Sequence, residues 1–270
     1  MALIAFVSAK GSPGATTTAL VAAALWPRDA VLVDADPAGG DVALRLPRSD
    51  GRPVDPDRGL LSLLPLARRD LPPAVLHQHT QRLAGGVPVL AGLSGPEQAA
   101  AVTPLWGALG RSFAALADAD VLVDAGRTAA TSAHLPLLQQ CDAVVCVLRA
   151  DVAGCVHARD RLAALAPHLV RPSGRPVRTG AVVVAPERAT RDVEGVRALL
   201  ERHLPSVEVL GPLALDPEGA AVFAGAPRSR PERTLLVRSA RPLVAELASW
   251  VAPTAPAAAT GAPAQEVGAA

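Results

Sequence analysis

A segment near the amino terminus has the residues that a phosphate-binding loop requires. Residues 9–17, AKGSPGATT, follow an apolar run at 3–9 and lead into an alanine-rich stretch at 16–25. A strand that passes through such a loop into a helix directs backbone N–H groups and the positive end of the helix dipole at an anion. Glycine permits close approach and positive φ angles, and the hydroxyl of Thr16 is a ligand suited to Mg²⁺. The segment therefore predicts a phosphate site.

This segment departs at two positions from the usual phosphate-loop pattern, GxxxxGK[ST]. Ala9 stands where the first glycine would be, and Ala15 stands where the lysine that reaches the phosphates would be. An ordinary Gly/Pro loop before an alanine-rich helix would have a similar sequence. The segment alone therefore leaves both interpretations open, and the choice depends on the motifs that follow.

Two later aspartates come directly after apolar runs. Asp34 ends the run VLVD and opens the segment DADPAGGD, which also contains Asp36. Asp124 ends the run DVLVD. In phosphate-loop enzymes a carboxylate in this place lies beside the water shell of Mg²⁺. Either segment alone could be an acidic turn after a strand, but their order along the chain favours a site shared with the loop.

The elements that must position these residues alternate between strands and helices. Continuous apolar runs predict buried strands at 3–9, 30–33, 87–91, 121–123, 143–148 and 181–185. Helices are predicted at 16–25, 59–67, 96–117, 152–165, 190–203 and 241–251, and Pro104 could divide the third. We therefore expect an α/β fold, a doubly wound and mainly parallel sheet with helices on both faces. The ligand should lie at the carboxyl ends of the strands.

The composition limits the classes of protein that are possible. The 270 residues are 50% hydrophobic and 19% charged with a net charge of +1, which excludes a disordered chain and a strongly basic nucleic-acid binder. With three Phe, three Trp and no Tyr, few rings are available for stacking on bases. We expect one domain over residues 1–251 and a disordered, Ala/Pro-rich tail over 252–270.

The cysteines and the amino terminus indicate a cytoplasmic protein. Cys141, Cys146 and Cys155 have the spacing of neither a CxxC redox motif nor a zinc site. An odd number of cysteines without a signal peptide is typical of free thiols in a reducing compartment. The start, MALIAFVSAKGSPG, lacks the basic residues and the long apolar run of a signal peptide. No apolar run approaches the ~18 residues of a transmembrane helix.

The amino-terminal segment resembles the deviant Walker A motif, KGGxGK[ST], of the ParA/MinD family of dimeric P-loop ATPases. Lys10 corresponds to the signature lysine, which in that family reaches across the dimer to the partner's nucleotide. The matching positions are Gly11, Gly14 and Thr16. Ser12 replaces a glycine, and Ala15 replaces the second lysine. Loss of that lysine is similar to the TadZ/CpaE branch and related septum-site-determining proteins.

The same resemblance, which covers roughly residues 1–250, implies roles for the later motifs. Asp36 would help to position the attacking water, and Asp34 would belong to the Mg²⁺ shell. The segment 124–127, DAGR, resembles the second switch, and residues 215–217 resemble a late segment that packs near the adenine. The expected nucleotide-binding residues are Lys10, Gly11, Ser12, Pro13, Gly14, Ala15, Thr16, Thr17, Asp216 and Pro217. The expected metal ligands are Thr16, Asp34 and Asp124, and the residues expected to act in hydrolysis are Asp36 and Lys10.

The function implied by the resemblance is that of a cytoplasmic, ATP- and Mg²⁺-binding positioning or partitioning ATPase. It would act as a homodimer switch with a protein partner in chromosome partitioning, septum placement or pilus assembly. Deletion of comparable electrostatic groups costs about 3–4 kcal/mol, so Ala15 predicts slow or absent hydrolysis. Two alternatives remain open. One is a pseudo-ATPase scaffold that needs no nucleotide; the other is a metabolic P-loop enzyme of the amidoligase or dethiobiotin-synthetase type, which normally keeps the lysine.

Two weaker features have an ordinary explanation beside the functional one. His77 and His79 could bind a metal, but no carboxylate is close in the sequence, so a solvated loop is favoured. The apolar side of a helix at 242–251 could bind a membrane. Because its polar side carries Glu246 in place of the Lys/Arg that such helices use, packing in the core is favoured.

A group of arginines near the carboxyl terminus could contact DNA nonspecifically through its phosphates. The candidates are Arg228, Arg230 and Arg233. Because the chain is rich in arginine throughout, a solvated surface is the favoured interpretation.

Overall fold

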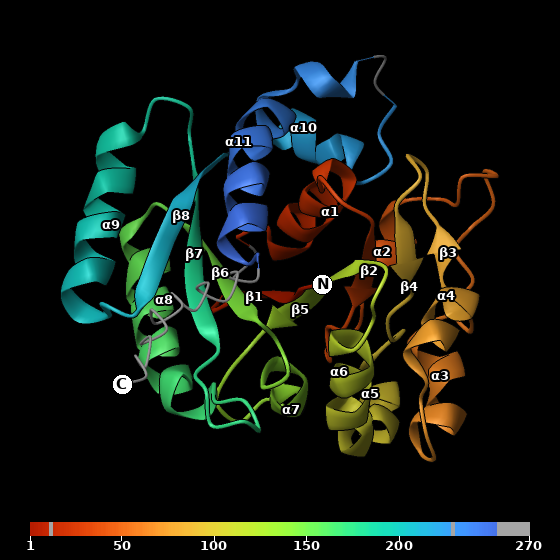
Figure 1. Ribbon diagram of the computed structural model, residues 1–270. Coiled ribbons are helices and arrows are strands. Elements are labelled where there is room, and N and C mark those ends of the chain that lie inside the picture. Colours follow the sequence, from red (N-terminus) through yellow and green to blue (C-terminus); the bar gives the residue numbers. More distant parts are fainter. Residues whose placement is uncertain (11–12, 228–229, 253–270) are drawn as a thin grey trace, which may run out of the picture.

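Most apolar runs of the chain coincide with observed elements, and several of these elements end at or just before aspartate, glycine or proline, as strand β2, Ala30–Asp34, does. The computed structural model describes residues 1–10, 13–227 and 230–252 (Figure 1). The strands are β1 Leu3–Ser8, β2 Ala30–Asp34, β3 Gln81–Arg82, β4 Pro88–Leu90, β5 Asp120–Arg127, β6 Ala143–Arg149, β7 Arg178–Ala185 and β8 Val207–Ala214. The helices are α1 Ala15–Leu25, α2 Val42–Arg45, α3 Leu60–Ala67, α4 Leu76–His79, α5 Pro96–Val102, α6 Trp106–Ala114, α7 Leu135–Leu138, α8 Val152–Leu165, α9 Thr190–His203, α10 Pro217–Val222 and α11 Leu235–Trp250. The tail predicted beyond Ala252 lies outside the described residues.

All these strands belong to one sheet of the described residues, in the order β3-β4-β2-β5-β1-β6-β7-β8. Every pairing from β4 to β8 is parallel, and the short β3 pairs antiparallel with β4. Parallel neighbours require crossover connections, which here carry the helices. The chain thus has the expected doubly wound, mainly parallel α/β fold.

Strand β1 is buried on both faces, which explains why its sequence has no polar side chain before Ser8. Leu3, Ala5 and Val7 belong to a core shared with α3 and α5 to α9. Ile4 and Phe6 belong to a second core, shared with α1 and α11. Successive side chains of a strand point to opposite faces, so a central strand covered by helices on both faces is apolar throughout. Figure 1 shows α1 and α11 packed together over one face.

Most predicted elements are confirmed, with small shifts at their ends. Helices α8 and α9 have the predicted bounds. The helix expected at 96–117 divides where the 3₁₀ segment Thr103–Leu105 separates α5 from α6. Pro104 lies in that segment, and it cannot donate the backbone hydrogen bond that a continuous helix would need there.

The short elements β3, α2, α4, α7 and α10 were not predicted, and two longer elements differ from the prediction. Helix α11 begins at Leu235 rather than near residue 241, because the hydroxyl of Thr234 accepts the Val237 N–H at 3.2 Å and caps the helix. No strand was expected where β8 lies, since it contains Gly211 and Pro212. Strand β8 pairs with β7 alone, and an edge strand tolerates proline because one side of it needs no partner.

The apolar side of α11 is buried in the molecule. Leu243, Val244 and Leu247 lie in the same core as α1, which agrees with core packing and not with a membrane-binding side. Within the described ranges, no helix combines the length and the apolar character that crossing a bilayer would require.

Candidate functional site

The end of β1 at Ser8 and the residues Pro13 and Gly14 before α1 lie together at the carboxyl edge of the sheet. Gly14 has a φ of +103° and allows the chain to turn directly into α1, which begins at Ala15. The hydroxyl of Thr18 donates to the Gly14 carbonyl at 2.8 Å and fixes this turn. The first N–H groups of a helix have no partner within it, so they are available to an anion. The predicted positions Gly11 and Ser12 lie outside the described residues.

A cavity of about 400 Å³ opens at this helix terminus, over the carboxyl ends of β1, β2 and β5. Its walls include five consecutive predicted positions, namely Pro13, Gly14, Ala15, Thr16 and Thr17. Asp36 and the glycine of DAGR, Gly126, form the facing wall. The sheet therefore brings the loop and both predicted switch segments to one cavity.

Asp124 lies just below this cavity, in direct contact with Thr16. The Thr16 hydroxyl donates to its carboxylate, and the Gly126 N–H donates to it at 3.2 Å. Burial raises the pKa of Asp124 to about 6, although both hydrogen bonds and the charge of Arg45 act in the opposite direction. The hydroxyl and the carboxylate predicted to share a metal ion are thus adjacent.

Asp34 lies deeper than the sequence analysis implied. It pairs in register with Asp124 and is completely buried. Its Oδ2 accepts the Val42 N–H at 3.1 Å, while its Oδ1 has no partner among the described residues. Burial, followed by the charge of Asp124, raises the pKa of Asp34 to about 8. In this arrangement Asp34 holds the start of α2 and does not line the cavity.

Two glycines create the space that Asp34 occupies. A Cβ atom on Gly40 would lie 2.2 Å from Asp34 Oδ2, and one on Gly92 would lie 2.7 Å from its Cγ. The Gly40 N–H donates to the Leu93 carbonyl at 2.7 Å, so the two glycine segments are also joined to each other. The segment after β4 therefore helps to enclose a side chain of β2.

Asp36 is the half-buried carboxylate of the cavity wall. Its Oδ1 accepts the Ala38 N–H at 2.8 Å. Burial raises its pKa, the charge of Asp41 adds to this effect, and the charge of Arg127 opposes it. Gly126, at φ +58°, passes so close that a Cβ atom there would lie 2.0 Å from Asp36 Oδ2. The two switch segments are therefore in contact at these residues.

The oxygen ligands present fit a magnesium ion that arrives with a phosphate. Among the described residues, no group of three or more His, Cys, Asp or Glu side chains could hold a metal ion by itself. Mg²⁺ commonly takes only one or two carboxylates and completes its shell with waters and substrate phosphates. Thr16 and Asp124 at the cavity supply such a partial set.

Two arginines line the cavity: Arg127, the last residue of the DAGR segment, to which the sequence analysis gives no role, and Arg45, which lies outside the quoted motifs. Arg45 Nη1 lies 3.5 Å from Thr17 Oγ1, and Arg127 lies on the exposed rim. Neither belongs to the phosphate-loop pattern itself, and no helix was predicted at the segment that carries Arg45. Their positions become apparent only when α2 and the end of β5 are folded against α1.

A second cavity, of about 310 Å³, adjoins the first at the same helix terminus. It lies at the carboxyl ends of β7 and β8 and shares Pro13, Gly14 and Thr17 with the first cavity. Leu213, Leu215 and Pro217 are among its other lining residues, together with Asp216. The late segment predicted to approach a nucleoside therefore faces the phosphate-loop segment.

Asp216 also organises the local backbone. Its Oδ1 accepts the Gly219 N–H at 2.9 Å, which caps α10, and its Oδ2 accepts the Leu236 N–H at 3.0 Å at the start of α11. Lys10, by contrast, is exposed and is not one of the described residues that line these two cavities. Its predicted role toward a partner's nucleotide stays a prediction.

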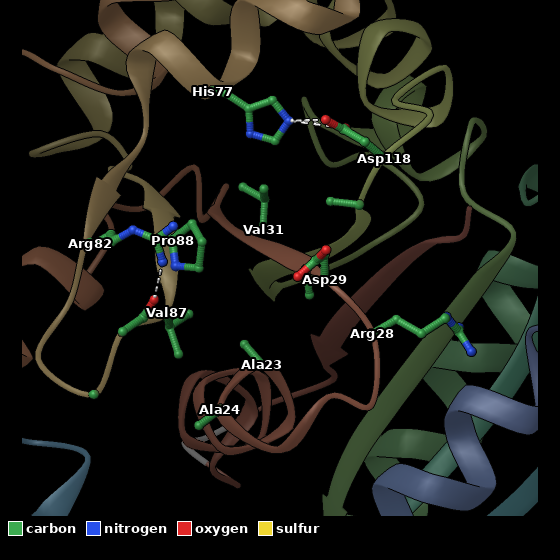
Figure 2. A pocket seen from close by; sticks show the side chains of 14 residues that line it. Ala23, Ala24, Arg28, Asp29, Val31, His77, Arg82, Val87, Pro88 and Asp118 are labelled. Carbon is green, nitrogen blue, oxygen red and sulfur yellow. Dashed lines mark hydrogen bonds and ion pairs between the residues drawn. The ribbon is translucent and has the colours of Figure 1, made fainter.

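A larger cavity, of about 470 Å³, lies at the opposite edge of the sheet, beside the start of β2 and β4. Figure 2 shows His77 in contact with Asp118, at 3.0 Å, and Arg82 donating to the backbone carbonyl of Gly86. Arg28 extends away from the cavity and pairs with Asp120 at 2.7 Å. The charged side chains that line the cavity, among them Arg82 and Asp29, are of both signs, so they do not select a ligand of one charge.

The two histidines considered as metal ligands do not converge. His77 pairs with Asp118, whereas His79 Nδ1 lies 2.6 Å from Ser62 Oγ. The arginines considered for DNA are exposed where the structure describes them, at Arg230 and Arg233, and Arg228 lies outside the described residues.

Comparison with solved structures identifies the fold class. A ParA family ATPase from Chlorobium tepidum superposes with a TM-score of 0.71 at 15% identity, over 90% of this chain and 98% of that one. The cell division ATPase MinD of Pyrococcus furiosus gives 0.67 at 21% identity, over 92% and 99%. The septum site-determining protein MinD of Pyrococcus horikoshii, complexed with Mg-ADP, gives 0.66 at 17% identity, over 91% and 95%.

At such low sequence identities, the superpositions show likeness of fold alone. The chain has the fold of the ParA and MinD ATPases across nearly its whole described length. No protein-family model matches the sequence, and no curated protein matches it. What the chain binds and does is therefore inferred from its own residues.

Proposed function

We propose that the chain is an ATP- and Mg²⁺-binding protein of the ParA/MinD type, acting in the cytoplasm as a nucleotide-dependent homodimer with slow or absent hydrolysis. The observation that carries this proposal is the meeting of two cavities at the first turn of α1. One is polar and lies over carboxylates; the other is lined mainly by apolar side chains. Such a pair suits the phosphates and the nucleoside of one ligand.

Each residue of the site would have a distinct task. The N–H groups at the start of α1 would bind phosphate oxygens, and the second cavity, with Asp216 and Pro217, would receive the nucleoside. Thr16 and Asp124 would hold Mg²⁺, which when bound neutralises charge on the phosphates. Asp36 would position the attacking water, and Asp34 would support the site from below by fixing α2.

Slow hydrolysis follows from the residue at position 15. The Ala15 side chain is a buried methyl group at the helix start, so it supplies no charge where phosphate-loop enzymes place a lysine. Loss of a comparable group slows the chemical step by about 10²–10³-fold. Ala15 is also the observation that favours the second candidate function, a pseudo-ATPase scaffold that docks its partner without nucleotide.

In either case we propose a protein partner from a positioning system that serves the chromosome, the septum or a pilus. Mg-ADP is bound by the horikoshii MinD, which supports a nucleotide ligand here by analogy of fold. Exposed Arg230 and Arg233, with Arg228, would contribute any nonspecific contact with DNA, and such contact should weaken steeply with salt.

Calorimetric titration with Mg-ATP tests the proposal. The wild-type protein should bind in the micromolar range. Asp124→Asn should weaken binding when Mg²⁺ is present and have little effect in EDTA, whereas Asp57→Asn, which changes an exposed acid, should bind as the wild type does. Light scattering should show ATP-dependent dimers that Lys10→Ala weakens. Absence of binding at millimolar ATP would overturn the nucleotide switch in favour of the scaffold.

A further inference from the structure

The cavity proposed for the phosphates lacks a lysine, yet it does not lack positive charge. Among the described residues that line it, the basic ones are Arg45 and Arg127. Arg45 is the last residue of α2, which follows β2, and Arg127 is the last residue of β5. Phosphate groups bring a high negative charge into this space, so one of these guanidinium groups has to be considered as their partner.

Arg45 is the better placed of the two. Its Nη1 lies 3.5 Å from the hydroxyl of Thr17, in the first turn of α1, two residues after Ala15. Arg45 lines the phosphate cavity, and Thr17, which it approaches, lines both cavities. Its charge also lowers the pKa of Asp124, whereas the charge of Arg127 acts on Asp36. Arg127 itself is exposed at the rim.

The side chain of Arg45 is only loosely engaged by the protein. Its ion-pair partner, Asp41, lies 3.5 Å away and is itself 61% exposed. Arginines with structural roles in this fold pair far more closely: Arg28 lies 2.7 Å from Asp120, and Arg171 lies 2.6 Å from Asp142. A charge-assisted hydrogen bond normally measures about 2.7–2.9 Å. Arg45 therefore has donors to spare for a ligand.

The backbone that carries Arg45 is, in contrast, firmly held. Asp34 accepts the N–H of Val42, whose side chain is completely buried, and the Arg45 N–H donates to the Asp41 carbonyl at 3.0 Å. Because the helical turn that carries Arg45 is already fixed, its guanidinium should lose little conformational entropy when it binds a ligand.

We propose that Arg45 binds the terminal phosphates of the nucleotide and supplies, from α2, the positive charge that Ala15 does not supply from α1. The proposal rests on the nucleotide binding put forward above. A planar guanidinium can bind two phosphate oxygens at once, and it keeps its charge at any physiological pH. Since α2 directly follows the segment of Asp36, the phosphates would hold that segment in place through Arg45.

A set of charge substitutions tests this assignment, with Mg-ATP affinity measured by calorimetry. Arg45→Ala should weaken binding about tenfold or more, as expected for loss of hydrogen bonds between charged groups. Arg45→Lys should recover part of the affinity. Arg48→Ala is the matched control, because Arg48 is nearby but pairs with Asp50 at 2.8 Å, and it should bind as the wild type does. Thermal unfolding would verify that all variants are folded.

The decisive variant, Ala15→Lys, introduces a lysine where phosphate-loop enzymes have one. Ala15→Lys should restore much of the affinity of the Arg45→Ala variant, and it should improve the wild type by a smaller factor, because one charge then replaces the other. If the wild type binds Mg-ATP and Arg45→Ala binds it equally well, the assignment of Arg45 is wrong and the proposed function stands. If the wild type binds no nucleotide, both are overturned together.

Discussion

At the scale of single residues, the Asp36 carboxylate lies so close to Gly126 that there is no room for a side chain at position 126. We predict that Gly126→Ala destabilises the protein by about 1–3 kcal/mol, because alanine is strained at φ +58° and its Cβ would overlap the Asp36 carboxylate. Chemical denaturation without nucleotide measures this. Gly195→Ala is the control: nothing lies within 4 Å of an added Cβ on this exposed position of α9, so helix propensity should stabilise that variant by up to about 1 kcal/mol. A Gly126→Ala variant as stable as the wild type would contradict the close contact.

A second residue, His134, should make stability depend on pH. Its Nε2 lies 3.0 Å from Thr128 Oγ1, its Nδ1 has no partner among the described residues, and burial lowers its pKa to about 4. The unfolded chain, with a histidine pKa near 6.5, binds more protons between these values. The contribution of His134 to the free energy of unfolding should therefore fall as pH decreases from about 6.5 to 4, by up to about 3 kcal/mol. The raised pKa values of Asp34 and Asp124 contribute in the opposite direction over this range, so the His134 contribution is measured against a variant that lacks the ring.

Urea denaturation between pH 7 and pH 4.5 checks this expectation. Relative to the wild type, His134→Gln, which keeps an amide able to bond to Thr128, should become more stable as the pH decreases over that range. His168→Gln, at an exposed histidine, should keep the wild-type slope. Equal slopes for the wild type and His134→Gln would show that the buried ring is not responsible.

Sequence reasoning located the aspartates correctly along the chain but could not determine their depth. Asp34 ends β2 and lies in register with Asp124 of the neighbouring β5, as expected from two apolar runs in a parallel sheet, although β5 continues past Asp124. Whether Asp34 faces the cavity depends on Gly40 and Gly92, and Gly92 belongs to a distant segment. Such depth is a property of packing, which motif spacing does not encode. For the same reason, motif spacing could not predict that Arg45 lies at the cavity.

At the scale of elements, Asp120 joins the start of β1, the end of α1 and β5. Its carboxylate accepts the Ala2 N–H at 2.6 Å, the Trp26 indole N–H at 2.7 Å and Arg28 Nε at 2.7 Å. We predict that Asp120→Ala destabilises the protein by about 3–5 kcal/mol, because three donors, among them the Ala2 N–H and the Trp26 indole N–H, lose a completely buried acceptor.

A neighbouring acid provides the control for this prediction. Asp118→Ala removes a side chain that is 69% exposed and pairs only with His77 in the described chain, so its effect should stay within about 1 kcal/mol. Both variants can be compared by guanidinium denaturation. A small effect of Asp120→Ala would mean that other contacts hold the three elements together.

The long elements were predictable because each has a pattern of its own, whereas the short ones depend on tertiary contacts. Helices α8 and α9 are long enough for their composition to define them. Helix α2 has only four residues and exists where Asp34 accepts the Val42 N–H. An isolated turn of this length is unstable in water, so no local sequence signal could have predicted it with its functional arginine.

At the scale of the whole molecule, two apolar side chains are exposed on the edge that carries the candidate site. Leu44 in α2 is 86% exposed and Val152 at the start of α8 is 82% exposed; both follow the carboxyl ends of strands. Under the proposed dimer, Leu44→Ser should reduce ATP-dependent association measured by analytical ultracentrifugation while leaving stability within about 0.5 kcal/mol. Val170→Ser, 40% exposed near the opposite edge, is the control. Unchanged association of Leu44→Ser would place any interface elsewhere.

The exposed position of Lys10 has a practical consequence. It is the only lysine of the chain, so apart from the terminal amine it is the one place where an amine-reactive dye can attach. A fluorophore coupled there would be located between β1 and α1, at the end of the sheet that carries both cavities. Without any engineered cysteine, the natural sequence thus offers a single labelling point from which arrival of a ligand could be followed in real time.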